Sequence, residues 1–242
     1  RLFVYNDEGD CLGSFTADNR QKDGTFWTQA LPGERLYIEY NGGEQPARLL
    51  LDRVLHGYKG SYGGSRGAKD RMGYSGDCHI NVVCPEGDPY RDQIRSAVHL
   101  KMATEDAAFV CSGALINNTA NDKTPYVLTA YHCQDFPTPL VQWTVYFNYE
   151  VTYCDNNWVG PSDQSLIGAD IVAKETPSGG SDMCLLRLHD AVPDSYKPYY
   201  AGWDRSVVER PTDNRKICFG IHHPAGDFKK ISIPFTVRQS SG

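Results

Sequence analysis

The feature that most constrains the fold is a succession of short apolar segments, separated by glycine, asparagine, aspartate or proline. Segments of four to seven residues match β-strands, and no convincing helix of ten or more residues interrupts them. The segments with strand character are 2–5, 35–40, 79–83, 108–111, 124–128, 141–147, 171–173 and 183–188. The sequence therefore predicts an all-β protein, built as a barrel or a sandwich.

A glycine-rich, basic stretch at 57–76 separates two β-rich blocks. It contains seven glycines and almost no aliphatic residues. Its basic residues are Lys59, Arg66, Lys69 and Arg71. Segments of this composition are flexible and readily cleaved by proteases. We therefore expect a small β-rich N-terminal domain at 1–56, a linker at 57–76 and a larger domain at 77–242.

The cysteines indicate the compartment. They form no Cys-x-x-Cys pair and accompany no His-Glu-x-x-His motif, so a zinc site is not favoured. Their wide scatter fits disulfides between strands, which form in oxidising surroundings. The sequence therefore predicts a secreted, extracellular or periplasmic protein. The cysteines lie at positions 11, 78, 84, 111, 133, 154, 184 and 218.

The charge balance argues against nucleic acid as a partner. The chain carries 24 Lys and Arg against 30 Asp and Glu, a net charge of −6. Its basic residues form no tract longer than a dipeptide such as Lys229-Lys230, which we expect to be a solvated pair. The longest apolar runs, such as Leu49-Leu50-Leu51, are too short to cross a bilayer. We therefore expect a monomer that binds neither nucleic acid nor membrane.

The most specific local feature is a histidine, His132, which follows the apolar segment 127–130 and precedes Cys133. A lone histidine in such a place is most often a core residue. Upstream, however, Cys111 follows an apolar pair and precedes small residues. A bridge between the two cysteines would close a loop across the histidine and stabilise the fold by roughly 3 kcal/mol. Such a disulfide would fix the position of His132, as a general base requires.

The second candidate residue is Asp182, which stands directly before the apolar strand segment 183–188. Taken alone, an aspartate at the mouth of a strand is usually a turn or capping residue. As the partner of His132 it has a suitable setting, because the apolar strand would bury its carboxylate. A buried aspartate fixes the tautomer of a catalytic imidazole and stabilises the imidazolium that forms. We therefore expect Asp182 to accept a hydrogen bond from Nδ1 of His132.

Further motifs occur in a consistent order over about residues 74–235. They are Cys-Ser-Gly-Ala-Leu at 111–115, Asn-Asn-Thr-Ala-Asn-Asp at 117–122, Leu-Thr-Ala-Tyr-His-Cys at 128–133, Ala-Gly-Trp-Asp-Arg at 201–205 and Ile-His-His-Pro at 221–224. Together they resemble the trypsin-like serine peptidases and, within them, the bacterial lysyl endopeptidases. Residues 1–56 resemble, less specifically, the pro-region of such precursors. One departure is Tyr131, where the trypsin-like pattern has a small residue.

The resemblance implies a trypsin-like double β-barrel and a secreted endopeptidase that cleaves proteins or peptides, after lysine, by acyl transfer. It implies no cofactor and no metal. By the same resemblance, Cys111 pairs with Cys133 and Cys84 with Cys154. Cys78 matches a cysteine whose partner lies beyond the nucleophile, so we expect it to be free here. Cys184, in an apolar strand, is expected to be a buried thiol.

The nucleophile of the family stands in a Gly-x-Ser-Gly-x-Pro turn well downstream of the strand that carries Asp182. None of the residues after Asp182 matches that motif. Ser241 precedes a glycine, but it lies too soon after Pro224, so we do not favour it as the nucleophile. We therefore expect the second barrel to be incomplete and this chain, as given, to be inactive. The alternative is a pseudoprotease that acts as a binding or structural module.

The N-terminal block and the linker are expected to form an activation device. The linker has exposed basic residues among glycines, so it fits a protease cleft at little cost. We expect cleavage at Lys69 or Arg71, which would release residues 1 to about 70 as a pro-segment. The alternative is a permanent accessory domain on a flexible tether.

Overall fold

A computed structural model describes residues 1–20, 24–43, 48–56, 75–76, 78–105, 107–136, 140–155, 164–204 and 219–233. Most of the expected linker, Cys218 and Ser241 lie outside these residues. The chain forms two compact units, Arg1–Met72 and Gly73–Gly242, which we call the N-terminal unit and the peptidase-like unit. Within the described ranges, no helix is both long and apolar enough to cross a membrane.

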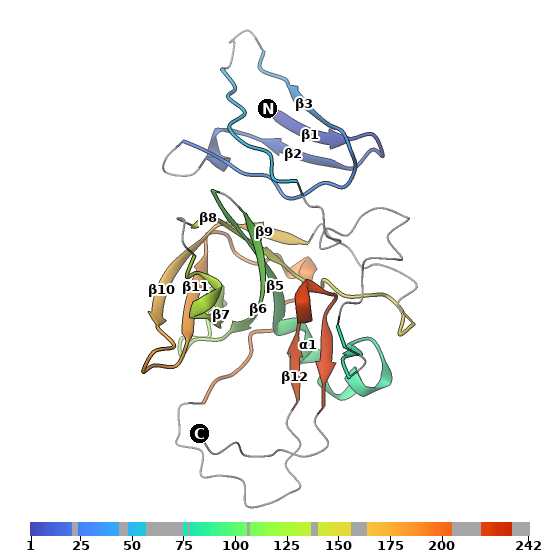
Figure 1. Cartoon of the computed structure of the whole chain (residues 1–242), viewed down its shortest axis with the longest axis vertical. Helices are drawn as coiled ribbons and strands as arrows, with labels where there is room; N and C mark the ends of the chain where they lie inside the picture. The colour runs from blue at the N-terminus through green and yellow to red at the C-terminus, as the bar shows by residue number, and fades with distance from the viewer. Residues whose placement is uncertain are drawn as a thin grey trace, which may run out of the picture. The chain divides into compact units, whose positions relative to one another are not determined.

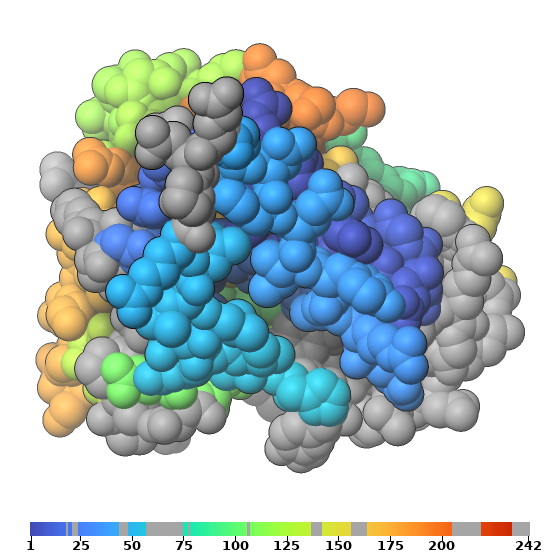
Figure 2. Space-filling view, turned by 90° about the horizontal axis from the view of Figure 1, so that it is seen from above, coloured from blue at the N-terminus to red at the C-terminus, as the bar shows by residue number. Residues whose placement is uncertain are grey.

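The N-terminal unit is a three-stranded antiparallel sheet with the order β2-β1-β3. Its strands are β1 (Leu2–Asn6), β2 (Cys11–Phe15) and β3 (Leu36–Tyr40). The central strand β1 alternates buried and half-buried residues, as expected of a strand with one covered face. The edge strand β3 is exposed along its whole length. Figure 2 looks onto this unit, which runs from dark blue to cyan.

The peptidase-like unit is dominated by a seven-stranded antiparallel sheet, which we call the barrel sheet, with the order β10-β11-β7-β6-β5-β8-β9. Its strands are β5 (Ala97–Thr104), β6 (Ala108–Ile116), β7 (Tyr126–Ala130), β8 (Leu140–Tyr146), β9 (Ser165–Ile167), β10 (Ala169–Glu175) and β11 (Met183–Leu188). The two edge strands, β9 and β10, are consecutive segments separated only by Gly168, so the sheet curls until its edges meet (Figure 1).

The interior of the barrel sheet is apolar because alternate residues of its strands point inward. On β11, for example, Cys184, Leu186 and Leu188 are buried. Gly113 leaves the room that this packing needs, because a Cβ there would approach Val127 to 2.8 Å. The fully buried core residues of the sheet include Val98, Leu100, Leu115, Val127, Val145 and Leu186.

A second, smaller sheet has the order β12-β13-β4 and consists of β12 (Gly220–His222), β13 (Lys230–Ser232) and β4 (Ile80–Asn81). It brings the first described strand of the unit beside the last. Its own core contains Val82, Ile94 and Ile231. Ile94 belongs to the one described α-helix, α1 (Arg91–Ser96), which follows a 3-10 segment.

The all-β prediction is confirmed, and α1 is too short to alter it. All eight predicted strand segments coincide at least partly with strands, whereas β2, β5, β9, β12 and β13 were not predicted. The prediction that Lys229-Lys230 is a solvated pair is wrong, since the two residues are 0% and 3% exposed. Both lysines find acceptors inside the protein, where β13 packs between β4 and β12.

Candidate active site

His132 lies where β7 ends. After Ala130 the chain leaves the strand and makes a single 3-10 turn, Tyr131–Cys133. The third residue of this turn, Cys133, is buried and forms a disulfide with Cys111 of β6, with a Cα–Cα distance of 6.2 Å. The disulfide therefore ties the turn that carries the histidine to the neighbouring strand pair, as the sequence predicted.

Asp182 lies directly before β11, which pairs with β7. Oδ2 of its carboxylate is 2.7 Å from Nδ1 of His132, and Oδ1 accepts the backbone N–H of His132 at 3.0 Å. Its own carbonyl accepts the N–H of Tyr131 at 2.9 Å. The aspartate thus holds the histidine by ring and backbone together, and the predicted contact through Nδ1 is present.

The backbone conformation of Asp182 explains why its carboxylate points toward His132. Its φ of 52° is left-handed, a conformation that aspartate tolerates better than most residues. Gly179, three residues before it, also has a positive φ, of 79°. Ser181 is fixed by Glu175, which accepts its hydroxyl at 2.5 Å and its backbone N–H at 3.2 Å. The loop 176–182 between β10 and β11 thus presents the carboxylate to His132.

The expectation that an apolar strand buries Asp182 is wrong. Its side chain is 31% exposed and that of His132 is 67% exposed. The strand begins only after the aspartate, so the apolar positions of β11 cover the barrel interior and not this carboxylate. The hydrogen bond from His132 nevertheless holds the pKa of Asp182 below its usual value. The carboxylate therefore remains an anion beside the imidazole.

Glu175 was not singled out from the sequence. It ends β10, and its hydrogen bonds to Ser181 lower the pKa of its carboxyl. A glutamate facing a Gly-Gly-Ser turn is not a distinctive pattern, so the sequence holds little signal for this role. Its neighbour Lys174 lies over the ring of Tyr131, with Nζ 5.7 Å from the ring centroid. Tyr131, the departure from the family pattern, thus packs beside a cation.

The second predicted disulfide, Cys84–Cys154, is also present. Cys184 is a buried free thiol and Cys78 an exposed one, as expected. Three potential metal ligands, Cys111, His132 and Cys133, lie together, but both sulfurs are consumed by their disulfide. Neither cysteine can therefore donate a thiolate to a metal.

Among the described serines, Ser75 stands in a sequence that resembles the nucleophile motif of the family. Gly73-Tyr74-Ser75-Gly76 matches Gly-x-Ser-Gly, with Cys78 at the place of the motif's proline. The hydroxyl of Ser75 donates to Asp227 at 2.6 Å. A carboxylate partner does not substitute for the imidazole base that a serine nucleophile needs. In the structure the hydroxyl of Ser75 is therefore bonded to Asp227, a carboxylate outside the His132–Asp182 pair, and Ser241 falls outside the described residues.

A protein family model and a curated relative both match this chain. The family model described as "Lysyl endopeptidase, C-terminal domain" matches residues 72–241. A lysyl endopeptidase of Pseudomonas aeruginosa is 29% identical over 218 residues, which cover 86% of this chain and 45% of that relative. The chain therefore spans less than half of the relative's length.

Solved structures give looser likenesses. An HtrA-type protease with a tripeptide has a TM-score of 0.42 and 14% identity, covering 61% of this chain and 38% of that chain. An inactivated protease paralogue of the scabies mite has a TM-score of 0.40 and 16% identity, covering 59% of this chain and 60% of that chain.

Proposed function

Because the chain belongs to the lysyl endopeptidase family, we propose that it carries the general base and its orienting residue for a serine endopeptidase that cleaves after lysine. It is a trypsin-like serine peptidase chain by family. The preference for lysine is carried over from the lysyl endopeptidase family and from the Pseudomonas aeruginosa relative. The observation that carries the proposal is the 2.7 Å contact between Nδ1 of His132 and Oδ2 of Asp182.

The proposed reaction assigns one task to each residue. Asp182 accepts a hydrogen bond from Nδ1–H of His132 and stays ionised, so the other ring nitrogen, Nε2, is left free to accept a proton. Nε2 takes the proton of a serine hydroxyl as that oxygen attacks the peptide carbonyl. The imidazolium then gives this proton to the leaving amine, and the C–N bond breaks. Water, deprotonated by the same imidazole, releases the acyl group and restores the serine.

We further propose that the nucleophilic serine lies outside the 242 residues. The serine motif of the family does not occur after Asp182 in this sequence. The chain also covers only 45% of the Pseudomonas aeruginosa relative. On this proposal the chain is inactive by itself, and the longer protein is active.

Peptide cleavage by the full-length protein tests the proposal. Peptides that differ only in having lysine, arginine or alanine before the cleaved bond are digested and the products identified by mass spectrometry. We expect cleavage after lysine and its loss in His132→Ala. Cleavage after arginine alone would remove the lysine preference. No cleavage of any peptide, with the folded protein intact, would favour the pseudoprotease.

We propose that the N-terminal unit is a pro-segment of a secreted precursor. The two disulfides of the peptidase-like unit suit an oxidising compartment. The division of the chain near Met72 leaves the basic linker residues Lys69 and Arg71 at the end of the first unit. N-terminal sequencing of the secreted, active protein is the test. A start between Asp70 and Ser75 is expected, whereas retention of residues 1–56 would make them an accessory domain.

A further inference from the structure

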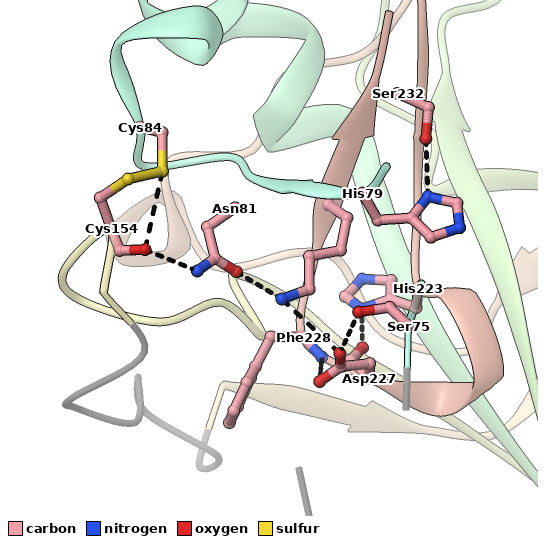
Figure 3. A network of polar contacts seen from close by, with 10 residues as sticks. Ser75, His79, Asn81, Cys84, Cys154, His223, Asp227, Phe228 and Ser232 are labelled. Carbon is pink, nitrogen blue, oxygen red and sulfur yellow. Dashed lines mark hydrogen bonds and ion pairs between the residues drawn. A yellow bond between two sulfur atoms is a disulfide. The ribbon is translucent and has the colours of Figure 1, made fainter. Parts of the chain in front are cut away.

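A buried polar cluster lies apart from the His132–Asp182 pair and is centred on Asp227 (Figure 3). Oδ2 of this carboxylate accepts the hydroxyl of Ser75 at 2.6 Å, and Oδ1 accepts the N–H of Phe228 at 2.7 Å. Nζ of Lys230 lies 3.6 Å from Oδ2. The side chains of Asp227 and Lys230 are only 2% and 4% exposed. The cluster therefore buries a complete ion pair.

The cation of this pair is held as firmly as the anion. Nζ of Lys230 donates to Oδ1 of Asn81 at 2.6 Å, and Nδ2 of Asn81 donates to the carbonyl of Cys154 at 3.1 Å. Cys154 is fixed in turn by its disulfide to Cys84. The cluster thus joins β4, β13 and a disulfide to the first described residue after 57–74, Ser75 (Figure 3).

Such an ion pair is not retained for stability alone. Removing two charges from water costs several kcal/mol for each ion, and an apolar pair of similar volume often stabilises a fold as well or better. What a fully hydrogen-bonded buried pair does supply is a fixed geometry. Asp227 is therefore expected to fix the position of the backbone around it.

Asp227 ends a turn that lies against the strands of the barrel sheet. Two successive residues of this turn, Ala225 and Gly226, have positive φ values of 53° and 75°. A left-handed alanine is strained and persists only where its surroundings hold it. A Cβ on Gly226 would come within 3.0 Å of Val110 in β6, so the turn touches that strand.

A chain of hydrogen bonds leads from the turn to the strand of His132. The carbonyl of Asp227 lies 3.0 Å from Nδ1 of His223, which is buried. The backbone N–H of His223 donates to Oγ of Ser112 at 2.8 Å. The carbonyl of Ser112 accepts the hydroxyl of Thr129, at 2.8 Å. Thr129 lies in β7, separated by one residue from the turn with His132, and Ser112 adjoins the disulfide-bonded Cys111.

From these contacts we propose that Asp227 is a positioning residue for the His132 base, anchored by Ser75 and neutralised by Lys230. The expected effect on catalysis rests on the proposed function, that of a serine endopeptidase with His132 as its base. Asp227 holds the turn at 223–227, the turn holds Ser112, and Ser112 fixes the strands from which His132 projects. Misplacement of a catalytic group by about 1 Å can cost about a hundredfold in rate, even when the altered residue is remote.

The experiment compares three single variants of the full-length protein. Asp227→Asn removes the negative charge with little change of shape, and Ser75→Ala removes only the anchoring hydroxyl. Asp194→Asn is the matched control, because Asp194 pairs with Lys123 at 3.2 Å on the exposed surface. Each variant is measured for kcat and KM on a lysine peptide, and for the exchange of the His132 Nδ1 proton with water by NMR.

We expect Asp227→Asn to lower kcat about tenfold to a hundredfold, with KM changed by less than about threefold. Ser75→Ala should lower kcat by about threefold to tenfold, because it weakens the anchor and keeps the ion pair. In both variants the Nδ1 proton should exchange faster than in the wild type. Asp194→Asn should match the wild type in every reading.

A folded Asp227→Asn with wild-type kcat and wild-type proton exchange overturns the proposal. If Asp227→Asn does not fold, Ser75→Ala provides the test. Exchange of the His132 Nδ1 proton at the wild-type rate in Ser75→Ala would then overturn the proposal. If the wild type cleaves no peptide, the proposed function fails, yet the proton exchange still tests the positioning role. The two failures are therefore distinguishable.

Discussion

Asp182 and Asp227 are two carboxylates of one unit that are paired in opposite surroundings. Asp182 faces an imidazole with 31% of its side chain exposed, whereas Asp227 faces an ammonium group with 2% exposed. The first partner is an imidazole, which has a nitrogen that can act as a general base, while the second is an ammonium group, which offers only hydrogen-bond donors. The exposed pair is therefore suited to proton transfer, and the buried pair to holding a geometry.

The largest expected effect is on the exposed pair. Asp182→Asn should lower kcat/KM of the full-length protein by about four orders of magnitude, because an amide no longer selects the tautomer that leaves Nε2 basic. Steady-state cleavage of a lysine peptide measures this. Asp170→Asn is the control, since Asp170 also pairs with a histidine, His189, at 3.3 Å and lies exposed. If Asp182→Asn keeps more than about a tenth of the activity, Asp182 is not the orienting residue.

The next effect is on stability and belongs to the buried pair. Lys230→Ala should lower the free energy of unfolding by about 3–5 kcal/mol, because it leaves the Asp227 carboxylate buried without its cation. Urea unfolding gives the value. Lys123→Ala, which removes the cation of an exposed pair, should cost at most about 1 kcal/mol. Equal losses in the two variants would remove the distinction between buried and exposed pairs.

The third-largest effect is expected from removing the disulfide beside His132. Replacing Cys111 and Cys133 together by alanine should cost about 3 kcal/mol of stability, since the denatured chain regains the freedom of the closed loop. Thermal or urea unfolding of the double variant is compared with that of Cys11→Ala, which alters an exposed thiol in the N-terminal unit. A double variant as stable as that control would show that the disulfide does not brace the turn of His132.

The smallest effect concerns pH and the histidines next to the buried cluster. His99 and His223 stack with their ring centroids 4.9 Å apart. Burial is the first cause that holds the pKa of each well below its usual value. Electrostatic repulsion from His223 and then from Lys101 lowers the pKa of His99 further, and repulsion from Lys229 lowers that of His223 further. Across the stack, Tyr149 also faces His99.

The sign follows from these lowered pKa values. Because the folded protein keeps both rings neutral, the stabilisation is fully present above about pH 6.5 and is lost as the pH falls below it. Each imidazole should cost about 1 kcal/mol of stability between pH 7 and pH 5.5. Urea unfolding at the two pH values measures the loss, which His99→Leu should reduce by about half. A loss that does not change in His99→Leu contradicts this assignment.

The sequence predicted the exposed pair but not the buried cluster, for physical reasons. His132 and Asp182 each adjoin an apolar strand, and the cysteines mark the strand pair that supports them. Asp227 and Lys230 stand in a polar segment that locally reads as a solvated turn. Their burial depends on Ser75, 152 residues away, and on Asn81, 149 residues from Lys230. Short-range patterns do not contain such contacts.

The same reasoning explains why β5 of the barrel sheet was not predicted. β5 includes His99 and Lys101 among its apolar residues, which weakens its strand pattern. In the structure His99 is fully buried against Tyr149, and Nζ of Lys101 lies 4.4 Å from the ring centroid of Tyr146. Burial lowers the pKa of Lys101 to about 7. The aromatic partners come from the region of β8, which only the fold brings beside β5.

Labelling by an active-site-directed fluorophosphonate tests most directly whether His132 serves a serine nucleophile. The reagent is applied to the full-length protein and to its His132→Ala variant, and the modified peptide is identified by mass spectrometry. We predict one labelled serine outside residues 1–242, and a labelling rate reduced by at least about a hundredfold in the variant. Label on Ser241 would contradict the proposed place of the nucleophile, and an unchanged rate in His132→Ala would contradict the proposed role of His132 as its base.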